Sequence, residues 1–148
     1  MWPRTHILLG LIFSFLIWIV FPTIVWYDIL LIFLSSFLID FDHYMAYVNK
    51  TGNWSLFKSL KYHDKVQIIE AQELKKGIKR RGDFHIFHTF EFHLAILAIG
   101  LIFAPFLFIF IGMTFHSVMD IISLKKRRLL HRREFFLTNW IKTHCKNC

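Results

Sequence analysis

Residues 82–93 read GDFHIFHTFEFH, and residues 94–119 read LAILAIGLIFAPFLFIFIGMTFHSVM without one charged side chain. Three histidines and one glutamate thus fall within nine residues, directly before a segment apolar enough to enter a membrane. Imidazole and carboxylate groups beside hydrocarbon are costly unless they are paired or bind a metal. The first stretch therefore predicts either a metal site or a helix start whose histidines face headgroups and water.

Helical spacing favours the metal site. On an α-helix, His85 and His88 lie on one row that Glu91 continues, and His93 lies to the other side of His85. Several of these four side chains can therefore face one centre.

The apolar run has two interpretations, because Pro105 lies near its middle. As one kinked helix over 84–124, it would hold its two polar ends about 40 Å apart, on opposite membrane faces. As a hairpin broken at 104–106, it gives two helices of about 20 residues whose polar ends meet. The 18 Lys and Arg decide in favour of the hairpin: one is Arg4, nine lie between Lys50 and Arg81, and eight follow from Lys125. The positive-inside rule then places all three basic regions in the cytoplasm.

The rest of the chain fits the same plan. Residues 7–27 carry no charge, which predicts a membrane helix at about 5–21 that ends at Pro22, and a second at about 24–46. The polar segment 47–83 contains a capping-box-like DKVQ at 64–67, which predicts an amphipathic helix that ends at 79–82.

Composition supports a membrane protein. The chain has 148 residues, 55% of them hydrophobic and 18 of them Phe, which exceeds the usual content of a soluble domain. We attribute the net charge of +8 to anionic lipid and membrane topology, and expect no nucleic acid partner. The two cysteines, Cys145 and Cys148, give no disulfide framework; we expect a reduced tail there rather than a metal site with His144.

The predicted fold is all-α: an integral membrane four-helix bundle of two helical hairpins, with an amphipathic cytoplasmic helix between the hairpins. Residues 1–124 form the membrane-embedded domain, in which 47–83 is the cytoplasmic connecting segment, and 125–148 form a basic cytoplasmic tail. The protein is expected in the inner membrane with both termini in the cytoplasm.

This topology brings the unusual polar residues to one membrane face. His116 and Asp120 share a helix face at i and i+4, as do Asp40 and His43 at i and i+3. Asp42 turns away from Asp40 and suits an outer-shell role or a second ion. The mixed His and carboxylate set, without Cys, favours Zn²⁺, with Mn²⁺ or Fe as alternatives, and one to three ions. The candidate ligands are His6, Asp40, His43, His85, His88, His93, His116 and Asp120.

Four short motifs occur in an order that resembles a known family. They are RTH at 4–6, IDFDH at 39–43, HTFEFH at 88–93 and HSVMD at 116–120. Together they resemble the membrane-bound, metal-dependent hydrolase family that includes a LexA-regulated inner-membrane hydrolase, over about residues 4–124. Ile39 stands in place of the family's proline, and Thr89-Phe90 replaces its Arg-Gly. The family is distantly similar to zinc-dependent phospholipase C and single-strand nucleases, which by analogy implies phosphoester substrates.

The favoured hypothesis is a membrane-embedded hydrolase of a lipid or nucleotide-like phosphoester. A metal-bound hydroxide would attack, with Glu91 or Asp42 as the general base and Lys79, Arg80 or Arg81 receiving the phosphate. Membrane lipids and a small-molecule or lipid phosphoester are the expected partners, and the oligomeric state is open.

Two other functions compete. A di-iron membrane oxidase fits less well, because the chain has no adjacent His pair and its carboxylates are prominent. A non-enzymatic metal-binding or transport protein is the other alternative. Candidate ligands gathered at one face argue against a conduction path.

Overall fold

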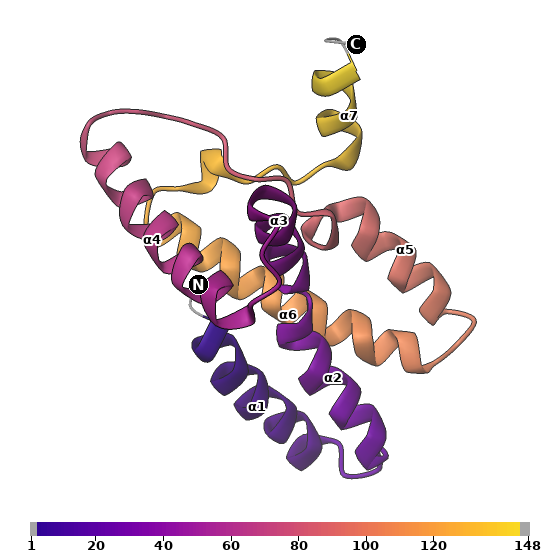
Figure 1. The fold of residues 1–148 in the computed structure, drawn as a ribbon. Helices are drawn as coiled ribbons and strands as arrows, with labels where there is room; N and C mark the ends of the chain where they lie inside the picture. The colour runs from indigo at the N-terminus through magenta and orange to yellow at the C-terminus, as the bar shows by residue number, and fades with distance from the viewer. Residues whose placement is uncertain (1–2, 146–148) are drawn as a thin grey trace.

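The computed structural model describes residues 3–145, whose regular elements are all helices, with no β-strand in that range (Figure 1). The all-α prediction is therefore confirmed for the described part of the chain. The helices are α1 (Pro3–Val20), α2 (Trp26–Leu38), α3 (Phe41–Thr51), α4 (Leu56–Lys75), α5 (Phe90–Gly100), α6 (Pro105–Lys126) and α7 (Leu137–Cys145), with 3-10 turns η1 (Ile86–His88) and η2 (Leu130–Arg132).

Two helical hairpins form the body of the molecule. α1 packs on α2, α5 packs on α6, and α2 packs along α6 to join the hairpins (Figure 1). The chain reverses at 101–104, and Pro105 begins α6, where its missing N–H costs no helical hydrogen bond. The apolar run is thus a hairpin and not one kinked helix.

The α2–α6 contact depends on a small residue. A Cβ on Gly112 would lie 2.1 Å from Ser35 Oγ and 2.3 Å from the carbonyl oxygen of Ile32. Small residues let helix backbones approach this closely when lipid surrounds them. Gly112 therefore sets the distance between α2 and α6.

The predicted second helix, 24–46, is broken at its inner end. α2 ends at Leu38, and α3 begins at Phe41 after a turn through Ile39 and Asp40. Short i to i+3 hydrogen bonds, from Asp40 N to Phe37 O and from His43 N to Asp40 O, tighten the backbone there. The prediction of one continuous helix is wrong at this point.

The histidines before α5 are not helical as predicted. His85 is extended, residues 86–88 form η1, and Thr89 Oγ1 accepts from Phe92 N to cap a helix that starts only at Phe90. α5 therefore has 11 residues instead of about 20. His85 and His88 do not share a helix row with Glu91.

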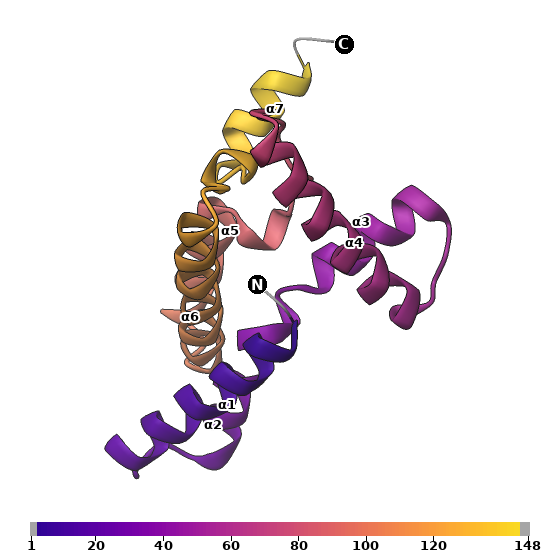
Figure 2. The ribbon, with the colours of Figure 1, turned by 90° about the vertical axis from the view of Figure 1, so that its left-hand side faces the viewer.

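The connecting segment forms α4, which begins earlier than expected. Ser55 Oγ accepts from Lys58 N and caps the helix ahead of the predicted start near 64, and the helix ends at Lys75, short of 79–82. Figure 2 shows α3 and α4 standing to one side of the two hairpins.

The chain after α6 turns back toward the segment before α5. Arg132 O accepts from Gly82 N at 2.8 Å, Phe135 O accepts from Phe90 N at 2.9 Å, and the rings of Phe84 and Trp140 stack. Of the CxxC motif, residues 146–148 lie outside the described residues.

Two helical stretches are long and apolar enough to cross a membrane: 26–51, which combines α2 and α3, and α6. The apolar helices α1 and α5 are shorter. Many large apolar side chains on these helices and their connecting turns are exposed, among them Leu8, Phe15, Ile19, Phe21, Trp26, Leu94, Leu101 and Ile102.

Gly112→Ala should destabilise the protein by about 1–3 kcal/mol, because the new methyl group forces α2 away from α6. Thermal unfolding in detergent measures this loss. Ala98→Val, on an exposed position of α5, adds more volume without crowding a helix contact and should leave the melting temperature nearly unchanged. An unchanged melting temperature in Gly112→Ala would contradict the close α2–α6 contact.

Candidate metal centre

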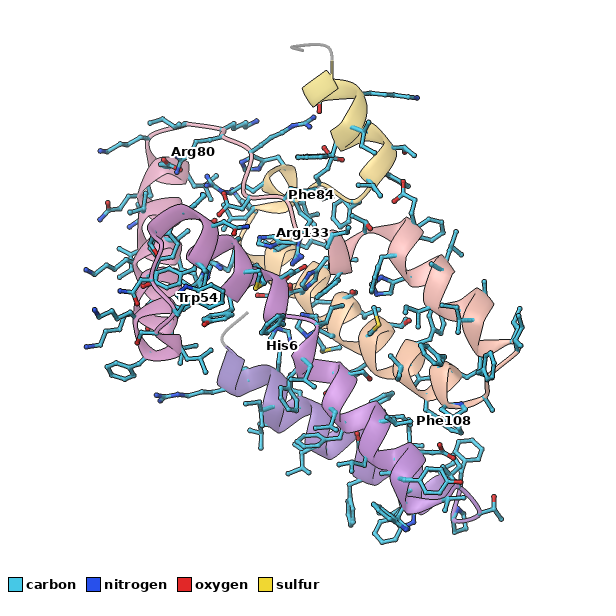
Figure 3. The ribbon with its side chains drawn as sticks, turned by 45° about the vertical axis from the view of Figure 1, so that its right-hand side comes forward. His6, Trp54, Arg80, Phe84, Phe108 and Arg133 are labelled. Carbon is cyan, nitrogen blue, oxygen red and sulfur yellow. The ribbon has the colours of Figure 1, made fainter. Side chains whose placement is uncertain are left out.

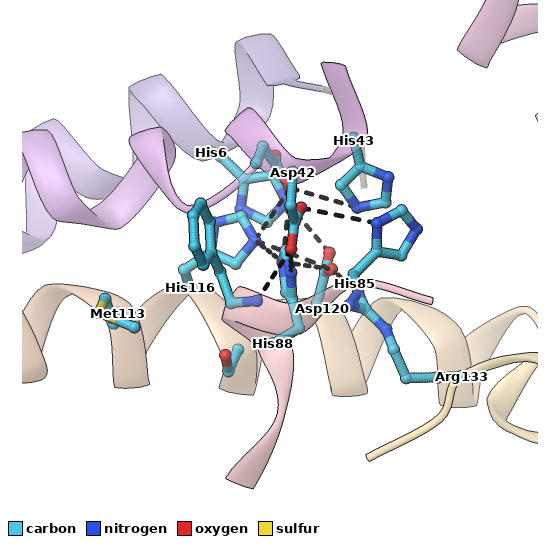
Figure 4. Close-up of polar contacts among 12 residues, drawn as sticks. His6, Asp42, His43, His85, His88, Met113, His116, Asp120 and Arg133 are labelled. Atoms are coloured by element: carbon cyan, nitrogen blue, oxygen red, sulfur yellow. Dashed lines mark hydrogen bonds and ion pairs between the residues drawn. The ribbon is translucent and has the colours of Figure 1, made fainter. Parts of the chain in front are cut away.

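Side chains from five parts of the chain meet at the ends of the hairpins. Asp40 comes from the α2–α3 turn. Figure 4 shows His6 of α1, His88 of η1 and Asp120 of α6 around the same place. Arg133, which follows η2, reaches the same place. In Figure 3, His6 and Arg133 lie near the middle of the molecule, and Phe108 lies toward the far end of α6.

Four side chains at this place form what we call the inner group: Asp40, His88, His116 and Asp120. One ligand atom from each lies within 4.8 Å of the other three. Asp40 Oδ1 lies 3.4 Å from His116 Nε2 and 3.5 Å from His88 Nε2, and Asp120 Oδ2 lies 3.8 and 4.0 Å from the same two atoms. Ligands at about 2.0–2.1 Å from Zn²⁺ in a tetrahedron are about 3.3–3.4 Å apart, so the inner group fits an ion with little movement.

The outer hydrogen bonds of the two histidines fix their tautomers. His88 Nδ1 lies 3.0 Å from Asp42 Oδ2, and His116 Nδ1 lies 2.8 Å from the carbonyl oxygen of Ser36. Because both oxygens only accept, each Nδ1 carries a proton, and each Nε2 has a lone pair whenever its ring is neutral. These lone pairs face each other with the two Nε2 atoms 3.2 Å apart. Such an arrangement calls for a cation between them, as in carboxylate–histidine–metal sites.

The carboxylates around His88 also favour a positive charge at the inner group. Burial alone would lower the pKa of His88, but its hydrogen bonds with Asp40 and Asp42 raise that pKa above the usual value. The group thus attracts positive charge, and a proton and a metal ion compete for one place.

A second layer holds Asp120. His6 Nε2 donates to Asp120 Oδ1 at 3.1 Å, and the His6 ring stacks on His116 with ring centres 3.9 Å apart. Arg133, almost buried, donates to Asp120 Oδ2. The structure therefore places His6 where it orients two members of the inner group, and its own Nε2 is engaged by Asp120.

His43 and His85 lie on the other side of Asp40 and Asp42. His43 Nε2 is 3.5 Å from Asp40 Oδ1, and His85 Nδ1 is 3.6 Å from Asp42 Oδ1. Burial lowers the pKa of His85 to about 4, so its ring is neutral at physiological pH. The ring of His85 therefore offers a lone pair rather than a charge.

Two predicted site residues lie apart from this cluster. Glu91 accepts hydrogen bonds from Leu137 N at 2.9 Å and from the amide and hydroxyl of Thr138, so its carboxylate caps α7. His93 contacts Thr89 O and Ser117 Oγ, both at 3.0 Å, and links α5 to α6. The structure does not bring either side chain to the inner group.

Sequence reasoning missed Arg133. It pointed to Lys79, Arg80 and Arg81, but Arg80 pairs with Glu73 and Arg81 with Glu134. No spacing in the sequence singles out Arg133, because only the turn after α6 brings it back to Asp120.

A cavity of about 560 Å³ opens onto the cluster. Its cationic lining comprises Lys50, Arg80, Arg81, Arg127, Arg132 and Arg133, and its apolar lining includes Phe37, Leu38, Phe41, Leu56 and Leu60. Asp40, His43, His85 and Asp120 reach the same cavity. All six cationic groups are paired with carboxylates, so the lining combines ion pairs with an apolar surface.

Comparisons of the chain with protein-family models, with curated proteins and with solved structures found no match. The chemistry of the site is therefore inferred from its residues. Histidine and carboxylate ligands without thiolates can hold Zn²⁺, Mn²⁺ or Fe.

His88→Ala and His116→Ala should each lower the Zn²⁺ affinity of the purified protein at least tenfold, since changes in outer-shell residues alone cost about 10–100-fold. Equilibrium dialysis with elemental analysis measures this. His93→Ala is the matched control, because His93 bonds to Thr89 and Ser117, and it should keep full metal content. Full occupancy in both test variants would mean that the cluster is only hydrogen-bonded.

Proposed function

We propose that this protein is a membrane-embedded, metal-dependent hydrolase that acts on a phosphoester. The observation that supports the proposal most is the inner group, in which two carboxylate oxygens and two imidazole lone pairs converge within 4.8 Å. A divalent ion bound there, Zn²⁺ by preference, would lower the pKa of a bound water and supply a nucleophile near neutral pH. The motifs that resemble the metal-dependent hydrolase family contain all four residues.

The proposed membrane placement follows from the apolar surface and the charge distribution. α1, α2, α5 and α6 would lie in the inner membrane, with both hairpin turns on the outer side and the basic segments in the cytoplasm. Asp120 lies 15 residues after Pro105, about 22 Å along α6. In a hydrocarbon core of about 30 Å with Pro105 at its outer boundary, the metal centre would then lie about 8 Å inside the cytoplasmic boundary.

The cavity supports a phosphoester substrate. Guanidinium groups match the geometry of phosphate oxygens, and Arg133 contacts Asp120 of the inner group. We propose that Arg133 contacts the phosphate next to the ion, with Arg80 and Arg81 farther out in the lining. The apolar lining, which includes Leu38, Leu56 and Leu60, would accept an acyl chain or another apolar part of the substrate.

Hydrolysis by the Zn²⁺-loaded protein in nanodiscs tests the proposal. Suitable substrates are p-nitrophenyl phosphate, its bis-ester and vesicles that contain phosphatidic acid. Arg133→Ala should lower kcat/KM by about 10²–10³-fold, the usual effect of removing a group that stabilises developing charge, with metal content retained. Lys126→Ala, at the exposed end of α6, is the control and should keep full activity. The proposal would be contradicted if the metal-loaded protein hydrolysed none of these esters, or if Arg133→Ala had the same kcat/KM as wild type.

A further inference from the structure

We propose that the centre binds a second divalent cation, held by Asp42, His43 and His85 and bridged to the first by Asp40. The inference rests on the proposed function, because it assigns this ion to the same hydrolytic site. It is argued from atoms of Asp42, His43 and His85, which are not members of the inner group.

Two buried polar atoms on this side have no hydrogen-bond partner among residues 3–145. They are Asp42 Oδ1 and His85 Nδ1, in side chains that are 7% and 9% exposed. Buried polar atoms nearly always make hydrogen bonds, so two neighbouring atoms that make none require an explanation. They lie 3.6 Å apart, too far for a hydrogen bond but close to the spacing of two ligands on one tetrahedral ion.

His43 completes a set of three donors. Asp42, His43 and His88 each have one ligand atom within 4.8 Å of the other two, and the ring centre of His85 lies 3.7 Å from that of His43. His88 also lies near Asp42, but its Nδ1 proton already points at Asp42 Oδ2. Within the described residues, His85 Nδ1 makes no hydrogen bond and contacts only Asp42 Oδ1 as an ion pair, so we take His85 as the second imidazole ligand.

Asp40 lies between the two sets of ligands. Its Oδ1 atom is 3.4 Å from His116 Nε2 and 3.5 Å from the Nε2 atoms of both His88 and His43. One carboxylate that touches imidazoles of both groups can bridge two ions. In phosphoester hydrolases, paired ions about 3.5–4 Å apart stabilise the attacking and the leaving oxygen together.

The two ions would differ in access. His43, His85 and Asp40 line the cavity, whereas the fully buried His116 does not. Figure 4 shows His43 and His85 on the side away from His6 and His116. The second ion would therefore face the substrate and exchange more readily than the first. Asp42 then acts as a ligand rather than as the general base.

Metal counting on the full chain in nanodiscs tests this inference. After dialysis against Zn²⁺, wild-type protein should hold two ions per chain, and His85→Ala should hold one. His131→Ala removes an exposed histidine of η2 and is the matched control, with two ions expected. With Mn²⁺ as the probe, wild type should show an exchange-coupled electron paramagnetic resonance spectrum, and His85→Ala a single-ion spectrum.

The outcomes separate the two proposals. One ion in wild type, unchanged in His85→Ala, would overturn the second site and leave the proposed hydrolase intact. Loss of both ions in folded His85→Ala would also overturn it, since it would indicate a single centre. No bound ion in wild type would overturn the proposed function itself.

Discussion

The opposed lone pairs of His88 and His116 are the constraint on which the rest of the structure depends. Each ring is turned toward the other by an outer acceptor, Asp42 for His88 and the Ser36 carbonyl for His116. These two acceptors belong to α3 and α2 and are not themselves members of the inner group. The orientation of both histidine rings therefore depends on where α3 and α2 lie. The close α2–α6 contact at Gly112 matters for the same reason, because it brings Ser36 within 2.8 Å of His116.

Irregular backbone lies where the site needs it. An unbroken helix through 39–43 would send Asp40 and Asp42 in different directions, whereas the turn at Asp40 lets one contact His116 and the other His88. The 3-10 turn at 86–88 likewise carries His88 into the cluster before α5 begins. The segment after α6 supplies Arg133, whose guanidinium group neutralises Asp120. Glu91 caps α7, the helix that follows this segment, and so holds it in place.

Sequence predicted the elements of this arrangement better than its details. The positions of Lys and Arg, with Pro105, were enough to predict a hairpin. The charges indicate which loops stay on one side of a membrane, and the proline ring interrupts a helix where it stands. The i and i+4 spacing of His116 and Asp120 indicated one shared face, and the structure brings both to the inner group. The helix break at Asp40, the capping role of Glu91 and the return of Arg133 depend on contacts between distant segments, which periodicity does not encode.

X-ray absorption at the metal edge tests most directly whether the inner group holds an ion through histidine and carboxylate. For Zn²⁺-loaded wild-type protein, we expect a nitrogen and oxygen shell at about 2.0–2.1 Å, with imidazole scattering that falls in His116→Ala. A sulfur shell at about 2.3 Å, or a spectrum without imidazole scattering, would contradict the assignment.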